Sequence, residues 1–134
     1  MLVFALGAKN TLPPNAEYAA PQLNPPASTA SAEVIKLGGE KYSQYCSVCH
    51  GQDGVQARGA FPNLTVSPLL HSQEGFDQVV LQGARVEKGM GNFSKDLAAA
   101  DSAAVREYLI ARANLLKKQA PPAAASDGNQ HQAN

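Results

Sequence analysis

Apolar and small side chains recur at helical spacing in the first part of the central region. Over residues 32–50 they are separated by three or four positions. In a helix with about 3.6 residues per turn, this spacing places them on one side. The residues on this face are Val34, Gly38, Tyr42, Tyr45 and Cys49. The pattern predicts a first helix from about Ala32 to His50.

A second helix is predicted between two glycine-rich segments. It begins after Ser72, a good N-cap, and ends at Gly83, a residue typical of helix ends. Its apolar face consists of Phe76, Val79 and Val80. The flanking segments, 51–68 and 84–100, lack a sustained period and are predicted to be loops.

A third helix is predicted near the end of the patterned region. Its N-cap is Asp101 or Ser102, and it ends near Lys117 and Lys118, whose charges suit the negative end of a helix dipole. Its apolar positions are Val105, Tyr108, Leu109 and Leu116. The three helices together predict an all-α domain over residues 31–118.

The pattern is lost on both sides of this domain. Residues 1–30 hold a short apolar run, Leu2 to Leu6, followed by many prolines. The run has the composition of a buried strand, either the remnant of a larger sheet or a frayed terminus. The prolines predict an extended linker or arm over 10–30. Residues 119–134 carry no large apolar side chain, and we expect a disordered tail.

Charge excludes several classes of partner. The 134 residues include 11 basic and 11 acidic side chains, so the formal net charge is zero. A protein that binds nucleic acid through phosphates needs a basic excess, which this chain lacks. The apolar run at the start is too short to span a bilayer, so we expect no transmembrane segment.

The strongest chemical signal is the run Cys46-Ser47-Val48-Cys49-His50. A Cys-x-x-Cys-His run is the signature of covalent c-type haem attachment. Thiols three positions apart lie on one side of a helical turn, so each can form a thioether with one porphyrin vinyl group. His50 then follows as a ligand for the iron. A cofactor would also supply the interior that so small a domain lacks.

Other interpretations of the two cysteines explain the sequence less well. A thioredoxin-like redox pair follows a strand in a βαβ unit, whereas these cysteines end a predicted helix. A structural zinc site needs four ligands, and no second cysteine pair exists. Two inert buried cysteines would leave His50 unexplained.

Haem iron has a sixth position that is filled by a second ligand or left open. Met90 is the candidate ligand, because it lies in the domain and the flanking Gly89 and Gly91 let the backbone approach a flat ring. His71 and His131 are rival ligands, and an open site is the remaining alternative.

From these residues, the chain resembles a class I cytochrome c domain over about residues 33–118. In that family a glycine and an aromatic residue four positions later, here Gly38 and Tyr42, precede the haem motif. The resemblance implies a small fold of three to four helices around one covalent haem c. It also implies that the carbonyl of Pro62 accepts the proton on the far nitrogen of His50.

Two further features bear on the haem site. The family usually has proline after the ligand methionine, whereas this chain has Gly91, so we expect a more mobile ligand loop. Arg58 and Arg85 lie in the two predicted loops, and either can pair with a haem propionate. The alternative for each arginine is ordinary solvated surface charge.

The order of a short apolar run, a proline-rich arm and a haem domain is similar to the C-terminal end of quinohaemoprotein alcohol dehydrogenases. Those enzymes join a propeller that holds pyrroloquinoline quinone (PQQ) and calcium to a haem c domain. The resemblance implies an electron-transfer domain that is not itself an enzyme. Its donor would be the PQQ dehydrogenase domain, its acceptor a small cytochrome, a copper protein or a quinone-linked chain, and its location the periplasm.

Three alternatives to this function remain open from the sequence. A haem with an open sixth site could bind small ligands or act as a peroxidase. The chain could be a free-standing monohaem cytochrome c. The haem could also be purely structural.

Overall fold

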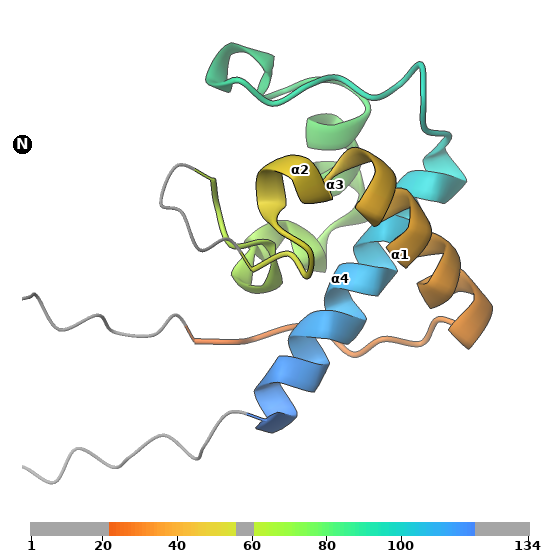
Figure 1. Cartoon of the computed structure of the whole chain (residues 1–134), viewed down its shortest axis with the longest axis vertical. Coiled ribbons are helices and arrows are strands. Elements are labelled where there is room, and N and C mark those ends of the chain that lie inside the picture. Colours follow the sequence, from red (N-terminus) through yellow and green to blue (C-terminus); the bar gives the residue numbers. More distant parts are fainter. Residues whose placement is uncertain (1–21, 56–60, 120–134) are drawn as a thin grey trace, which may run out of the picture.

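A computed structural model of the chain describes residues 22–55 and 61–119. In that part the chain forms α-helices and no strand, so the all-α prediction is confirmed (Figure 1). The α-helices are α1 (Ala32–Tyr45), α2 (Ser47–His50), α3 (Gln73–Val80) and α4 (Ala99–Gln119). The intervening 3₁₀ helices are η1 (Leu64–Val66), η2 (Pro68–His71) and η3 (Val86–Lys88). The predicted strand at Leu2–Leu6 and the tail after 119 lie outside the described residues.

The first predicted helix is interrupted at Cys46. The chain continues as α2, which ends at His50. At this point the Ser47 hydroxyl donates to the carbonyl of Ser43 at 2.6 Å, a back-bond of the kind that bends helices. The prediction of one continuous helix over 32–50 was therefore wrong. The break separates the two cysteines, because Cys46 lies before α2 and Cys49 within it.

The beginning of α3 is as predicted, since the Ser72 side chain accepts from the Gly75 amide at 3.0 Å. The beginning of α4 is not, because α4 begins at Ala99. Asp101 lies inside the first turn and accepts from the Ala98 amide at 3.0 Å. It therefore caps the helix from the third position, as acidic residues do in a capping box.

Ser102, the alternative N-cap, is buried instead of lying at the helix end. Its hydroxyl donates to Asp77 of α3 at 2.6 Å, and the same carboxylate oxygen accepts from Gln73 at 2.9 Å. This bond ties α3 to α4. It also satisfies a hydroxyl that is fully buried, which would otherwise cost free energy.

The centre of the fold is the crossing of α1 and α4. Gly38 is buried there, and a Cβ atom at this position would lie 1.9 Å from the carbonyl oxygen of Ala104. Tyr42 lies one turn further and stacks against Tyr108, with ring centroids 5.3 Å apart. The missing side chain of Gly38 is thus what lets the two helix backbones meet.

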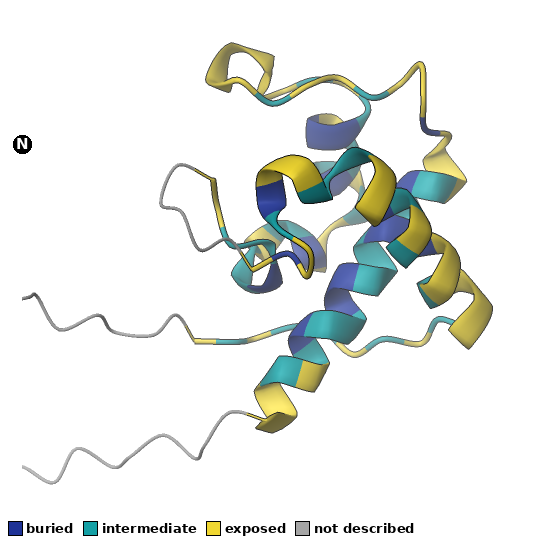
Figure 2. Ribbon diagram, in the orientation of Figure 1, coloured by how far each residue is buried: buried dark blue, intermediate teal, exposed yellow. Residues whose placement is uncertain are grey.

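The hydrophobic core lies along the inner side of α4 (Figure 2). Its buried members come from α1, η2, α3 and α4 and from the segment before α4. They are Tyr42, Leu70, Phe76, Val80, Leu97, Val105, Leu109, Ile110 and Ala113. Because α4 contacts both α1 and α3, its buried side chains cover a wide face.

The segment from Gln22 to Ser31 is extended and lies along the helices. Leu23 packs against the core cluster. Three polar bonds hold the segment: His71 Nε2 to the Asn24 carbonyl at 2.8 Å, Asn114 Nδ2 to the Pro26 carbonyl at 2.8 Å, and Ser28 Oγ to Glu107 Oε2 at 3.0 Å. This part of the proline-rich region is therefore packed on the domain.

The crossing gives a stability prediction. Gly38→Ala should destabilise the domain by about 3 kcal/mol or more, because the new methyl group meets the backbone of Ala104. Gly39→Ala is the matched control. Its Cβ would lie 3.1 Å from the side chain of Tyr108, which can shift, and alanine favours the helix by roughly 0.5–1 kcal/mol. Chemical denaturation, monitored by circular dichroism, measures the free energy of unfolding of each variant. Equal values for Gly38→Ala and Gly39→Ala would contradict the role of Gly38.

Candidate cofactor site

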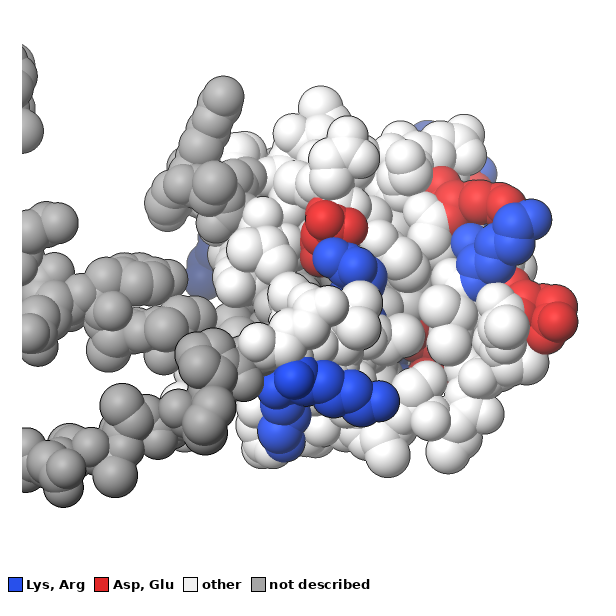
Figure 3. All heavy atoms as spheres, turned by 60° about the horizontal axis from the view of Figure 1, so that its bottom comes forward, with Lys and Arg blue, Asp and Glu red and all other residues white. Residues whose placement is uncertain are grey.

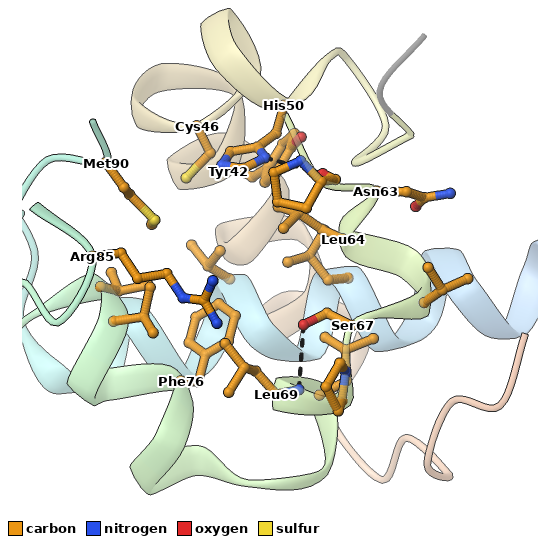
Figure 4. Close-up of a pocket in the computed structure, with 18 residues that line it drawn as sticks. Tyr42, Cys46, His50, Asn63, Leu64, Ser67, Leu69, Phe76, Arg85 and Met90 are labelled. Atoms are coloured by element: carbon orange, nitrogen blue, oxygen red, sulfur yellow. Dashed lines mark hydrogen bonds between the residues drawn. The ribbon is translucent and has the colours of Figure 1, made fainter. Parts of the chain in front are cut away.

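A cavity of about 360 Å³ lies between α2, α3 and the inner side of α4. Its wall is mainly apolar, and a few chemically active side chains enter it. The apolar wall includes Leu64, Leu69, Leu70, Phe76, Val80 and Leu109. Figure 4 shows Met90 and Arg85 entering from one side and Cys46 and His50 from another. Pro62 also lines the cavity, so five sequence-predicted site residues meet there.

His50 ends α2 and is 8% exposed. Its Nδ1 lies 3.4 Å from the carbonyl oxygen of Pro62, which also lines the cavity. A proton on Nδ1 would donate to that oxygen and leave Nε2 as a lone-pair donor. Burial lowers the pKa of His50, so the imidazole stays neutral, which is the form that binds metals.

The two cysteines have different surroundings. Cys46 is half-buried and lines the cavity, whereas Cys49 is exposed. Burial, followed by the nearby Cys49, raises the pKa of Cys46 to about 11. At neutral pH the Cys46 thiol therefore keeps its proton.

Met90 is held in the cavity by its backbone. The Met90 amide donates to the carbonyl of Arg85 at 3.2 Å, and Phe93 donates to Val80 at 2.9 Å. Gly89 has a φ of 88°, a left-handed conformation that glycine adopts without strain. The turn directs the thioether of Met90 toward the core cluster, against which it packs.

Among the described residues that line the cavity, Arg85 is the one with a permanent charge. The other polar groups there are neutral: a tyrosine, a serine, an asparagine, a thiol and an imidazole. A guanidinium beside an apolar wall favours a ligand that is apolar over most of its surface and carries a carboxylate.

These residues fit a haem. The apolar wall suits a porphyrin face, the imidazole and thioether are iron ligands, a thiol stands at the wall, and the arginine suits a propionate. Cys49 is outside the set that lines the cavity.

The other sequence candidates are Arg58, His131 and His71. Arg58 and His131 are outside the described residues. His71 does not line the cavity, and its Nε2 lies 2.8 Å from the carbonyl of Asn24 in the extended segment. Among the described histidines, His50 is thus the one that enters the cavity.

Sequence reasoning missed one ion pair near the site. Arg112 Nη2 of α4 lies 3.2 Å from Asp53 Oδ1, in the loop that follows His50. No local pattern relates these two residues, because the fold alone brings α4 beside this loop.

Comparison with known proteins now decides the family. A profile of the family described as "Cytochrome C oxidase, cbb3-type, subunit III" matches residues 33–109. The chain belongs to this family. It is a class I cytochrome c domain, similar to the cytochrome portion of quinohemoprotein alcohol dehydrogenases.

Three relatives illustrate the similarity. Quinohemoprotein alcohol dehydrogenase ADH IIB of Pseudomonas putida is 38% identical over 84% of this chain and 16% of its own length. The dehydrogenase subunit of alcohol dehydrogenase (quinone) of Acetobacter aceti is 32% identical over 94% of this chain and 17% of its own. The solved structure of quinohemoprotein alcohol dehydrogenase ADHIIG from Pseudomonas putida HK5 matches with a TM-score of 0.62 and 32% identity, over 75% of this chain and 15% of that one. The chain thus spans about a sixth of the length of these relatives.

The different surroundings of the cysteines predict different reactivity in the haem-free protein. An alkylating reagent at pH 8 should modify exposed Cys49 at least about tenfold faster than Cys46, because thiolate is the reactive form. Because the pKa of Cys46 is raised, its alkylation rate should increase only as the pH rises toward about 11. Mass spectrometry of digested protein measures both rates, and equal rates at pH 8 would contradict the burial of Cys46.

Proposed function

We propose that the chain carries single electrons through one covalently attached haem c with His50 and Met90 as axial ligands. The observation that carries this proposal is the entry of an imidazole and a thioether into one apolar cavity next to the Cys-x-x-Cys-His run. Membership of the cytochrome c family supports it. When bound, haem c supplies a one-electron iron couple whose potential depends on its axial ligands.

Each residue has a separate part in this proposal. Cys46 and Cys49 would hold the haem through two thioethers. Pro62 would accept the Nδ1 proton of His50, which leaves Nε2 as the nitrogen that can bind iron. Met90 would supply a second iron ligand, and a haem with both ligands bound would leave no position for oxygen or other small ligands.

The lining residues contribute electrostatics. The wall of the cavity is mainly apolar, and apolar surroundings strengthen a charge interaction beside them. Arg85 would pair with a haem propionate, and its positive charge would disfavour the more positively charged, oxidised state of the iron.

The names of the relatives support a dehydrogenase as the partner. We propose that electrons come from a PQQ-containing alcohol dehydrogenase portion and pass to a small cytochrome, a copper protein or a quinone-linked chain. The periplasm is the proposed location, because haem is attached to this motif on exported chains of the family. No helix in the described residues is long and apolar enough to cross a membrane.

The charge distribution supports brief docking rather than strong attraction. On the face shown in Figure 3, acidic and basic side chains form small groups on a mostly uncharged surface. The described ion pairs are Lys36–Glu40, Lys41–Asp101, Arg106–Glu107 and Arg112–Asp53. Charges paired in this way produce little long-range field.

Replacement of Met90 tests the axial ligand. In the haem-loaded protein, Met90→Ala should abolish the weak near-red absorption band of the oxidised form. It should also lower the reduction potential by a substantial part of the roughly 0.8 V range that axial ligands span. His71→Ala is the control and should change neither property, because His71 lies away from the cavity. An unchanged band in Met90→Ala, or rapid carbon monoxide binding by the unmodified ferrous protein, would refute Met90 ligation.

Arg85→Gln tests the lining cation. Loss of its charge should stabilise the oxidised form relative to the reduced form. A tenfold change in that equilibrium lowers the reduction potential by roughly 59 mV for one electron. Arg85 and Lys88 are both exposed, but Lys88, in η3, does not line the cavity, so the shift caused by Lys88→Gln should be much smaller. Potentiometric titration measures both, and equal shifts would mean that Arg85 acts as ordinary surface charge.

A further inference from the structure

The peptide that follows His50 is held by a buried hydroxyl. Tyr42 is 1% exposed, and its Oη donates to the carbonyl oxygen of Gly51 at 2.6 Å. Burial raises the pKa of Tyr42, so the hydroxyl keeps its proton and stays a donor. Gly51 is the residue directly after His50, so this bond fixes the backbone immediately beyond the proposed iron ligand.

The far end of the same loop is anchored to two other elements. Asp53 pairs with Arg112 of α4 at 3.2 Å. The carbonyl of Gly54 accepts from the amide of Leu64 in η1 at 2.8 Å. Gly54 is buried with φ of 77°, a conformation that favours glycine. The loop Gly51–Gly54 is thus attached to α1, α4 and η1 at once.

On the other side of His50, the ring is fixed by Pro62. The imidazole therefore lies between two anchors: its Nδ1 faces the carbonyl of Pro62, and its own backbone leads into the peptide held by Tyr42. A side chain held at both its ring and its backbone has little freedom to rotate.

We propose that Tyr42 is a positioning residue for His50, and that its bond to Gly51, together with the Asp53–Arg112 pair, keeps the imidazole in one orientation. This inference rests on the proposed role of His50 as an iron ligand. A ligand that stays in place while the iron gains or loses an electron keeps the associated rearrangement small, which favours rapid electron transfer. The tyrosine hydroxyl, and not only its ring, is then part of the electron-transfer apparatus.

Tyr42→Phe is the direct test, because it removes the hydroxyl and keeps the ring that packs at the helix crossing. In the haem-loaded protein the amides of residues 51–54 should exchange with solvent about tenfold faster, as expected for the loss of one buried hydrogen bond. The haem methyl signals in proton NMR spectra of the oxidised form, which report imidazole orientation, should shift or split. The electron self-exchange rate should fall by about three- to tenfold.

Tyr108→Phe is the matched control. Its ring stacks on that of Tyr42, but its hydroxyl makes no hydrogen bond with the described loop residues. The haem methyl signals and the self-exchange rate should stay as in the unmodified protein. If Tyr108→Phe reproduces the effects of Tyr42→Phe, aromatic packing and not the hydroxyl is responsible, and the inference is wrong.

Asp53→Asn provides a second variant that leaves the helix crossing intact. It should shift the haem methyl signals in the same direction by a smaller amount, because the Asp53 side chain is 53% exposed and its ion pair is weak. In Tyr42→Phe, the loop amides could exchange faster while the haem methyl signals and the self-exchange rate stay unchanged. In that case the loop does not position His50, and the inference is wrong although the proposed function still stands. If the unmodified protein shows no histidine-ligated haem, the proposed function fails with it.

Discussion

The close approach of α1 and α4 is the constraint on which the rest of the molecule depends. Gly38 allows the two backbones to meet, and this contact fixes how closely α1 lies against α4. The chain that leaves α1 carries Cys46 and His50 to the cavity, while α4 contributes the opposite apolar wall through Leu109. Glycine is thus a geometric requirement at a position far from any chemistry.

The cavity combines an apolar wall with one charged side chain. Arg85 lines it while remaining exposed to solvent, so its charge lies where the apolar wall meets water. A ligand that fits both is apolar over most of its surface and carries an anionic group at its exposed edge. Burial lowers the pKa of His50, which favours the neutral imidazole inside the same cavity.

The sequence predicted what is local and missed what depends on distant parts of the chain. The Ser72 cap and the helical periods were found because neighbouring residues determine them. The start of α4 was placed too late, since Ser102 looked like a cap but is buried against Asp77 of another helix. The break at Cys46 coincides with a bond from the Ser47 hydroxyl of α2 back to Ser43 of α1, which a periodic pattern does not reveal.

The candidate site, like the fold, was predicted only in part from the sequence. The motif named Cys46 and His50, and elimination pointed to Met90, so three of the residues that enter the cavity needed no structure to find. Tyr42 was named from the sequence as the aromatic residue four positions after Gly38, but the partner of its hydroxyl could not be foreseen. Short-range chemistry is encoded in motifs, whereas contacts between elements emerge only from the fold.

The extended segment before α1 also changes how force travels through the molecule. Because Pro26 and Ser28 are bonded to α4, a pull on this segment acts along that helix and loads both bonds together. The start of α1 therefore does not act as a hinge between this segment and the helices. A strain applied before Leu23 reaches the core directly, so in mechanical terms this segment is part of the rigid body that surrounds the cavity.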